Sequence, residues 1–323
     1  MTQLSTDVSP TLTKPVPLVP HAWWGTFCGL FSAVVYTVAN GFLRAVTDCD
    51  PIWVSAMKAF STAACLTPWL LLSLRRGEGF PPAKIWLMIA ASSLVGQLGG
   101  NISFQYALGQ IGLALTVPLS LGGMIVGATF LSRLFLHERV NLTSAIAVGV
   151  LLMAIAVLSL GAEEARAKVL QKVAANPWQL TVGVTTACLS GVAYSVLNVV
   201  IRHAVQRGAT LPATLVTVSL VGLTSLSLIA LQKIGWNGML QTAPVDVALM
   251  LAAGVCNAAA FVALTRCLQL TSVVYANVLN AAQAALAALA GVIVFHEPAS
   301  VALTAGVGLT IFGLVILTRR PHS

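Results

Sequence analysis

The chain has 323 residues, of which 58% are hydrophobic and only 8% are charged, and its mean hydropathy is +0.91. A soluble domain carries roughly 25% charged residues, so this composition excludes an ordinary soluble protein. The net charge of +8 would suggest nucleic acid as the partner of a soluble protein, but no basic patch is interleaved with aromatic residues. Nucleic-acid binding is therefore excluded, and lipid is the expected outer solvent.

Residues 1–21 form a polar tail with several prolines and no apolar core. We expect a disordered cytoplasmic segment there and not a cleavable signal peptide. Apolar runs of roughly 20 residues, the length that crosses a bilayer, follow along the chain. They occupy residues 22–44, 52–74, 84–108, 112–136, 142–160, 178–203, 211–233, 246–267, 272–295 and 300–318. The pattern predicts an all-α integral membrane protein with ten transmembrane helices and a short cytoplasmic tail, 319–323.

The two halves of the chain share an ordered series of motifs. The first and sixth spans each carry a tyrosine, an asparagine and an arginine at intervals of four residues. These are Tyr36, Asn40 and Arg44 in the first span and Tyr194, Asn198 and Arg202 in the sixth. Asn101 in the third span recurs as Asn257 in the eighth. The chain is therefore expected to hold two five-helix repeats, 22–160 and 178–318, joined by a connecting loop, 161–177.

An odd number of spans in each repeat has a consequence for topology. The second repeat must enter the membrane upside down relative to the first, and inverted repeats recur in secondary transporters, with the substrate site between the halves. Most of the 17 lysines and arginines fall on one side of the map if both termini are cytoplasmic. The positive-inside rule therefore predicts this orientation.

A His-Glu pair precedes the last span of each half, in His137-Glu138-Arg139 and His296-Glu297-Pro298, and a basic residue, Lys58, lies in the second span. With the five-plus-five duplication, these features resemble the EamA-type, ten-helix members of the drug/metabolite transporter superfamily. The resemblance covers nearly the whole chain, although the family usually has arginine where this chain has Lys58. It implies export or exchange of small metabolites such as amino acids across a bacterial inner membrane.

Polar side chains form stripes along several spans. Polar groups in hydrocarbon usually face the bundle interior or a water-filled path. A single such residue is more often an interhelical hydrogen-bonding contact than a ligand contact. Stripes on several spans together favour a lined central cavity. The candidate substrate-binding residues are Tyr36, Asn40, Lys58, Gln97, Asn101, Tyr194, Asn198, Asn257, Asn277, Asn280 and Gln283.

Lys58 is the one charged residue well inside a predicted span, and two readings of it stay open. The side chain could snorkel to the outer headgroups, at little cost from that depth. Alternatively it faces the cavity and attracts a carboxylate or another anion. Three further residues are assigned structural roles: Pro118 as a kink or hinge in the fourth span, and Glu138 and Glu297 as caps of the helices that follow them.

Several functions lack support. No HExxH, GxSxG or P-loop motif occurs, and the six cysteines form no CxxC pair, so we expect no enzymatic activity, metal or cofactor. No acidic residue lies deep in a span, which leaves coupling through a buried carboxylate unsupported. The favoured function is secondary transport of small organic metabolites by alternating access. A channel or non-transporting receptor is the alternative, and a membrane-embedded enzyme comes third. The partners are a small-molecule solute and the bilayer, and the oligomeric state stays open between monomer and homodimer.

Overall fold

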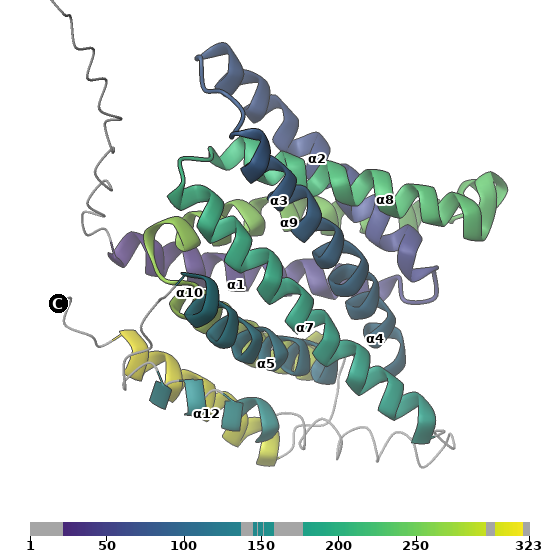
Figure 1. Ribbon diagram of the computed structural model, residues 1–323. Coiled ribbons are helices and arrows are strands. Elements are labelled where there is room, and N and C mark those ends of the chain that lie inside the picture. Colours follow the sequence, from purple (N-terminus) through teal and green to yellow (C-terminus); the bar gives the residue numbers. More distant parts are fainter. Residues whose placement is uncertain are drawn as a thin grey trace, which may run out of the picture.

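The computed structural model describes residues 22–136, 145–146, 148–150, 152–157, 177–294 and 301–318. Within these ranges the regular structure is entirely helical (Figure 1). The elements are α1 (Ala22–Ala45), α2 (Pro51–Arg75), α3 (Ala83–Leu94), η1 (Val95–Ile102), α4 (Ser103–Ile111), α5 (Leu113–Leu131), η2 (Ser132–Leu136), α7 (Pro177–Gln206), α8 (Leu211–Leu240), α9 (Pro244–Leu270), α10 (Val273–Asn280), α11 (Ala282–Val294) and α12 (Val301–Thr318). The all-α class is confirmed. The predicted tails 1–21 and 319–323, and residues 161–176 of the connecting loop, lie outside the described residues.

Among the described residues, eight helices are long and apolar enough to cross a membrane, judged by length and composition. They match eight of the ten predicted spans, with most ends within three residues. The seventh span runs to Leu240, seven residues past its predicted end, and the ninth ends at Ala290, five residues before its predicted end. Three of them are composite: α3, η1 and α4 run on as one span, as do α5 with η2 and α10 with α11. The fifth and tenth predicted spans correspond to shorter apolar helices, Val148–Val157 and Thr304–Gly313. The full count of ten therefore stays a prediction.

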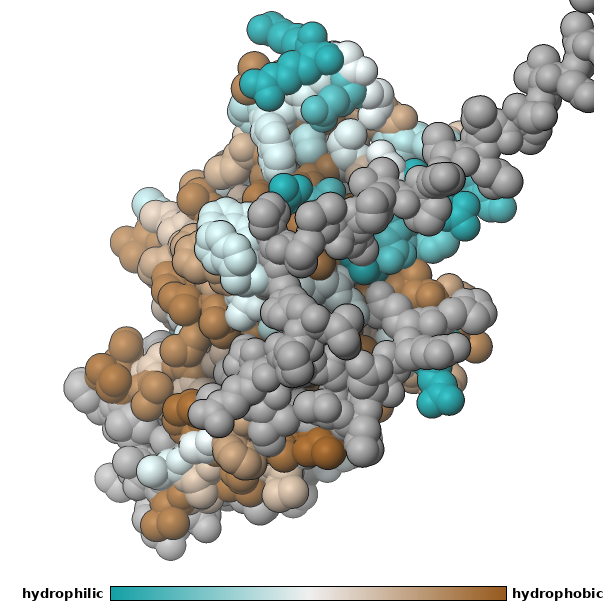
Figure 2. Space-filling model, turned by 90° about the vertical axis from the view of Figure 1, so that its left-hand side faces the viewer, coloured by the Kyte–Doolittle hydropathy of each residue, from teal (hydrophilic) through white to brown (hydrophobic). Residues whose placement is uncertain are grey.

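The outer surface of the bundle is apolar along the helices. Large hydrophobic side chains such as Phe31, Leu72, Phe130 and Leu228 are exposed on faces turned away from the core. Figure 2 shows apolar residues covering much of the visible described surface, with polar residues gathered at one end and along one edge. Such a surface needs lipid as its solvent, because soluble proteins seldom expose continuous apolar areas of this extent.

The two halves interlock rather than sitting side by side. In the first half α1 packs against α9, and in the second half α7 packs against η1 and α4. These two contacts are equivalent under the repeat, because exchanging the first five spans with the last five converts one contact into the other. Helix α2 packs against α8, its counterpart, and α5 packs against α10 and α11. The contacts therefore follow the sequence repeat and enclose a shared interior between the halves (Figure 1).

Small residues allow the closest approach, between α5 and α7. A Cβ added at Gly191 would lie 1.9 Å from the backbone oxygen of Ser120, and one at Gly123 would lie 2.6 Å from that of Cys188. Gly127 is similarly tight against Ser195. These glycines of α5 and α7 form a close-packing surface, because only a missing side chain lets the two backbones meet.

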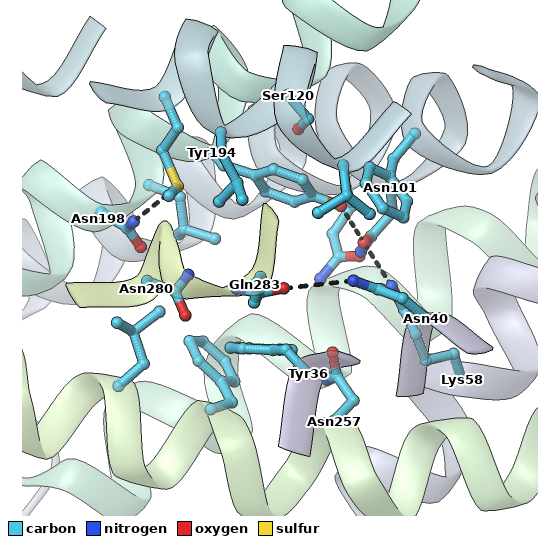
Figure 3. A pocket seen from close by; sticks show the side chains of 18 of the residues that line it. Tyr36, Asn40, Lys58, Asn101, Ser120, Tyr194, Asn198, Asn257, Asn280 and Gln283 are labelled. Carbon is cyan, nitrogen blue, oxygen red and sulfur yellow. Dashed lines mark hydrogen bonds between the residues drawn. The ribbon is translucent and has the colours of Figure 1, made fainter. Parts of the chain in front are cut away.

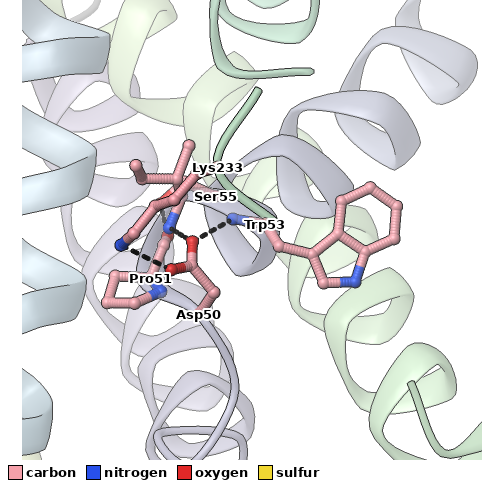
Figure 4. A network of polar contacts seen from close by, with 6 residues as sticks. Asp50, Pro51, Trp53, Ser55 and Lys233 are labelled. Atoms are coloured by element: carbon pink, nitrogen blue, oxygen red, sulfur yellow. Dashed lines mark hydrogen bonds and ion pairs between the residues drawn. The ribbon is translucent and has the colours of Figure 1, made fainter. Parts of the chain in front are cut away.

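Local sequence sets where α2 begins. Asp50 is the N-cap, its Oδ1 accepting hydrogen bonds from the backbone N–H groups of Ile52 (2.9 Å) and Trp53 (3.2 Å), and Pro51 follows at the first helical position. The Oδ2 atom of Asp50 forms an ion pair at 2.6 Å with Lys233 of α8 (Figure 4). The Trp53 indole donates to Thr242 at 3.0 Å. The start of α2 is thereby tied to the far end of α8.

Two glycines with positive φ shape the connections. Gly112, with φ of 76°, is the only residue between α4 and α5, so these two helices are joined by a tight hairpin. Gly235, with φ of 68°, interrupts α8 near the end of the predicted seventh span. An L residue with a side chain is strained at such angles, which explains glycine at both turns.

Candidate functional site

A cavity lies at the centre of the bundle and takes its walls from both halves. About 840 Å³ of empty space lies in the cavity together with its open mouth. Its lining comes from α1, α2, η1, α4, α5, α7, α8, α9, α10 and α11. The residues are Tyr36, Asn40, Lys58, Gln97, Asn101, Phe104, Val117, Ser120, Leu121, Met124, Tyr194, Leu197, Asn198, Val218, Asn257, Phe261, Leu264, Asn280 and Gln283.

Ten of the eleven residues proposed from the sequence line this one cavity. The exception is Asn277, which is fully buried and is absent from the cavity wall. Its Oδ1 accepts a hydrogen bond of 2.9 Å from Nδ2 of Asn198, so it lies behind that residue. Asn277 stands one helical turn before Asn280 on α10, and the packing of α10 against α5 and α7 turns it away from the open space.

Lys58 lies on the cavity and does not extend toward a helix end. It is 7% exposed, and its Nζ donates to Oδ1 of Asn101 at 2.6 Å (Figure 3). The same oxygen accepts a hydrogen bond of 2.6 Å from the hydroxyl of Tyr194. Among the described residues no carboxylate pairs with Lys58. A cation of the first half and a phenol of the second thus share one amide oxygen.

The π-helical segment η1 positions the amide side of the cavity. Its residues include Gln97 and Asn101, and the Asn101 amide donates to the Gln97 side-chain oxygen. Gln97 in turn donates to the backbone oxygen of Val218 at 3.2 Å, which ties η1 to α8. Farther along the same span, Gln105 is buried away from the cavity lining and donates to the backbone oxygen of Leu43 at 3.1 Å. π-helical turns often occur at functional sites.

The interruption between α10 and α11 provides the other polar wall. Asn280 ends α10 and Gln283 lies in the first turn of α11, with Ala281 between the two helices. Asn40 donates from Nδ2 to Oε1 of Gln283 at 3.2 Å (Figure 3). Ser32 approaches Oδ1 of Asn280 at 3.5 Å. Spans broken near the membrane midplane are a common way to build a solute site.

Sequence reasoning missed the apolar part of the lining. These residues are Phe104, Val117, Leu121, Met124, Leu197, Val218, Phe261 and Leu264. An apolar side chain facing a cavity and one facing lipid look alike in a sequence, so composition alone carries no signal for them. The structure supplies the relation that the sequence did not show: Lys58 and Val218 occupy the same position in their helices, each the eighth residue.

The residues given structural roles have mixed outcomes. Pro118 lies inside α5, which continues through it as a helix, and its neighbour Val117 lines the cavity. Glu138 and Glu297, proposed as caps, lie outside the described residues. Arg202, noted only as a repeated motif residue, is buried and donates to the backbone oxygens of Leu268 (2.5 Å) and Gln269 (2.9 Å). It caps the end of α9, where a positive charge is favoured by the helix dipole.

In the described part of the chain no three His, Cys, Asp or Glu side chains gather as metal ligands. The polar side-chain groups in the cavity lining are amides, two phenols, the Ser120 hydroxyl and one ammonium. These groups can hold an organic solute by hydrogen bonds and charge, and none is paired as a nucleophile with a base.

Comparison with known families decides the class. A model of the EamA-like transporter family matches the chain twice, over residues 21–160 and 181–319. The chain belongs to the EamA-like transporter family. The double match shows the two-repeat architecture and confirms the resemblance seen in the sequence. This EamA-like protein is thus a multi-pass membrane transporter of the drug/metabolite type, consistent with the expectation that it is not an enzyme.

The fold has a solved counterpart. A structure titled "Crystal structure of protein" superimposes on this EamA-like transporter with a TM-score of 0.69 at 17% sequence identity. The match covers 92% of this chain and 99% of the solved chain. At that identity the likeness shows the fold alone. A search of curated proteins finds no match.

Proposed function

We propose that this chain is a secondary transporter that exports or exchanges small organic metabolites, amino acids and related solutes, by alternating access between its two repeats. One observation carries the proposal: a single cavity takes repeat-equivalent residues from both halves. Tyr36 and Tyr194 line it together, as do Asn40 and Asn198. A site shared in this way can be exposed to either side by rocking one half against the other.

The hydrogen bonds across the cavity support a carrier over a pore. Asn101 joins Lys58 to Tyr194, and thereby bridges the two halves at the cavity. Asn40 of α1 is likewise bonded to Gln283 of α11. Such crossing contacts must break and re-form in each transport cycle, whereas a pore keeps its path open. A channel remains the second candidate because the cavity has an open mouth.

Counterflow in proteoliposomes tests the proposal. Purified protein is reconstituted with a saturating unlabelled solute inside, and uptake of the labelled solute is followed against a panel of amino acids and other small metabolites. A carrier gives saturable uptake that transiently exceeds equilibrium. Linear, non-saturating flux would establish the channel. Absence of flux for every solute, from protein shown to be folded by its thermal unfolding, would contradict transport.

We further propose a bacterial inner membrane location with both termini in the cytoplasm. The basis is the distribution of positive charge along the sequence, together with the family membership. The arrangement puts the loop between α2 and α3 inside the cell and the turn between α8 and α9 outside.

A further inference from the structure

The cavity carries one positive charge and, among the described residues, no negative one. Lys58 is its basic residue, and no aspartate or glutamate lines it. The described carboxylates lie at helix ends or in connections: Asp48 and Asp50 before α2, Glu78 after it, and Asp246 in the first turn of α9. A buried charge without a counter-ion is costly in a membrane protein. An anionic ligand supplies the missing counter-charge.

The ammonium group of Lys58 is held in place by a hydrogen bond and has further N–H groups that can donate to a ligand. It has three N–H donors, and the hydrogen bond it makes to a described residue is the one to Asn101. Asn101 is itself fixed from both sides by Gln97 and Tyr194. The position of the ammonium is thereby set before any ligand arrives. A carboxylate has two oxygens that can accept its remaining donors, which makes this group the best match.

A zwitterionic ligand fits this charge distribution less well. Its carboxylate would neutralise Lys58, but its own ammonium would return a positive charge to the cavity. The acceptors available for that ammonium are neutral oxygens, such as those of Asn280 and Tyr36. The occupied cavity would then keep a net charge of one, whereas a monoanion leaves it neutral. The charge balance therefore favours a ligand without an amino group.

Much of the remaining cavity wall is apolar, and the repeat places a cation in one half only. Lys58 of α2 is matched in α8 by Val218, which also lines the cavity. Val218 belongs to one continuous apolar cluster with three further lining residues, Leu197, Phe261 and Leu264. Figure 3 shows Lys58 and Asn101 at one end of the cavity and Asn198 at the other. The anionic group of a ligand is therefore expected at Lys58, and the apolar lining side chains accept the rest of its skeleton.

We propose that the cavity selects small organic monoanions that join a carboxylate to an apolar group, in preference to zwitterionic amino acids of the same carbon skeleton. The inference rests on the proposed transport function and narrows its substrate class.

The test compares matched probes in counterflow and in binding. 2-Hydroxy-4-methylpentanoate and L-leucine have the same skeleton and differ in a hydroxyl for an ammonium, and 2-hydroxypropanoate lacks the apolar branch. At pH 7.5 we expect counterflow of the branched hydroxy acid to exceed that of L-leucine and of 2-hydroxypropanoate by about tenfold or more, the ratio expected for one charge-assisted contact or a few buried methyl groups. Thermal shift of the detergent-solubilised protein with each probe reports binding without transport.

Three variants locate the effect. Lys58→Gln is expected to reduce the preference for the hydroxy acid over L-leucine to within about twofold, since the charge that distinguishes them is gone. Lys58→Arg is expected to retain the preference. Lys233→Gln makes the same substitution in a lysine that is 54% exposed and paired with Asp50 away from the cavity, so it should leave the preference unchanged.

Each outcome bears on a different statement. Counterflow of L-leucine equal to or faster than that of the hydroxy acid overturns the anion inference and leaves transport standing. A preference that survives in Lys58→Gln also overturns it. If no solute is transported, the transport function fails, and the thermal shift alone decides the inference. Stabilisation by the hydroxy acid that is absent in Lys58→Gln supports a monoanion site, and its absence in the unmodified protein overturns it.

Discussion

At the scale of single residues, the contact between Lys58 and Asn101 organises the cavity. The amide oxygen of Asn101 accepts from both Lys58 and Tyr194, each at 2.6 Å. It presents a partial negative charge to the ammonium and leaves the full counter-charge to a ligand. A neutral amide at this point keeps the cation in place without cancelling it.

A carboxylate in place of that amide is therefore expected to pair with Lys58 as the carboxylate of a ligand would. Asn101→Asp is nearly isosteric and would form an internal ion pair with Lys58. We expect solute counterflow to fall by about tenfold or more, because a ligand must displace the new carboxylate, while the thermal unfolding temperature stays the same or rises. Uptake assays and thermal unfolding in detergent measure the two effects.

The matched control adds the same charge at the other end of the cavity. Asn198→Asp introduces a carboxylate at the end of the cavity away from Lys58. Within the described part of the chain, no basic residue lines the wall at that end. A buried, unpaired carboxylate is expected to lower the unfolding temperature. If Asn101→Asp is destabilised as strongly as Asn198→Asp, Lys58 does not act as a free cation.

At the scale of helices, the two repeats begin their second spans differently. Asp50 caps α2 through two backbone N–H groups, whereas Thr210 stands at the N-cap of α8 without a side-chain cap bond. The hydroxyl of Thr210 is buried and lacks a hydrogen-bond partner. The N-cap side chain is thus expected to stabilise the helix in the first half and to contribute little in the second.

This difference predicts opposite sensitivities at the two caps. Asp50→Ala is expected to cost about 1–2 kcal/mol, because it loses the cap and the ion pair with Lys233. Thr210→Ala is expected to cost less than about 0.5 kcal/mol, because the hydroxyl makes no cap bond. Denaturant unfolding in mild detergent measures both. Equal losses at the two sites would show that cap geometry does not control the stability of these helices.

The packing of α5 against α7 gives a second prediction for helices. Gly191→Ala would place a Cβ 1.9 Å from the backbone oxygen of Ser120, which lines the cavity, so the helices must move apart. We expect a loss of about 1–3 kcal/mol and impaired transport. Gly41→Ala on α1 meets nothing within 4 Å and is the control, expected to be neutral or slightly stabilising. Thermal unfolding and uptake of the two variants test the pair, and a neutral Gly191→Ala would contradict the close approach.

At the scale of the whole molecule, the orientation in the membrane is the open prediction. Gly79 lies in the exposed connection between α2 and α3, and Gln241 lies in the exposed turn between α8 and α9. With both termini in the cytoplasm, these two positions face opposite sides of the membrane.

Cysteine labelling measures this arrangement directly. In a background with the six native cysteines replaced, Gln241→Cys is expected to react with a membrane-impermeant maleimide from outside intact cells. Gly79→Cys is expected to react only after permeabilisation, because its loop carries positive charge and stays inside. The background without an added cysteine should not react. Labelling with the reverse pattern would place the termini outside.

Much of the architecture followed from the sequence alone. The bilayer sets a span length near 20 residues, and that constraint marked off α1, α2, α7 and α9 within a few residues of their observed ends, whereas α8 extends seven residues past its predicted end. The repeated motifs around Tyr36 and Tyr194 predicted two halves and a cavity between them. Polar residues in apolar helices are conspicuous, so Asn40, Asn101 and Gln283 were found without any coordinates.

Tertiary structure decided which way each side chain turns. The sequence is compatible both with Lys58 snorkelling to the headgroups and with Lys58 facing the cavity. Packing against η1 and α7 places its ammonium on Asn101. The same packing hides Asn277 behind Asn198, although its stripe on α10 suggested otherwise. Apolar residues such as Val218 and Phe261 face either lipid or cavity at similar solvation cost, so the sequence carries no preference between the two. Helix contacts alone decide it, and with it which charged, polar and apolar groups line the site.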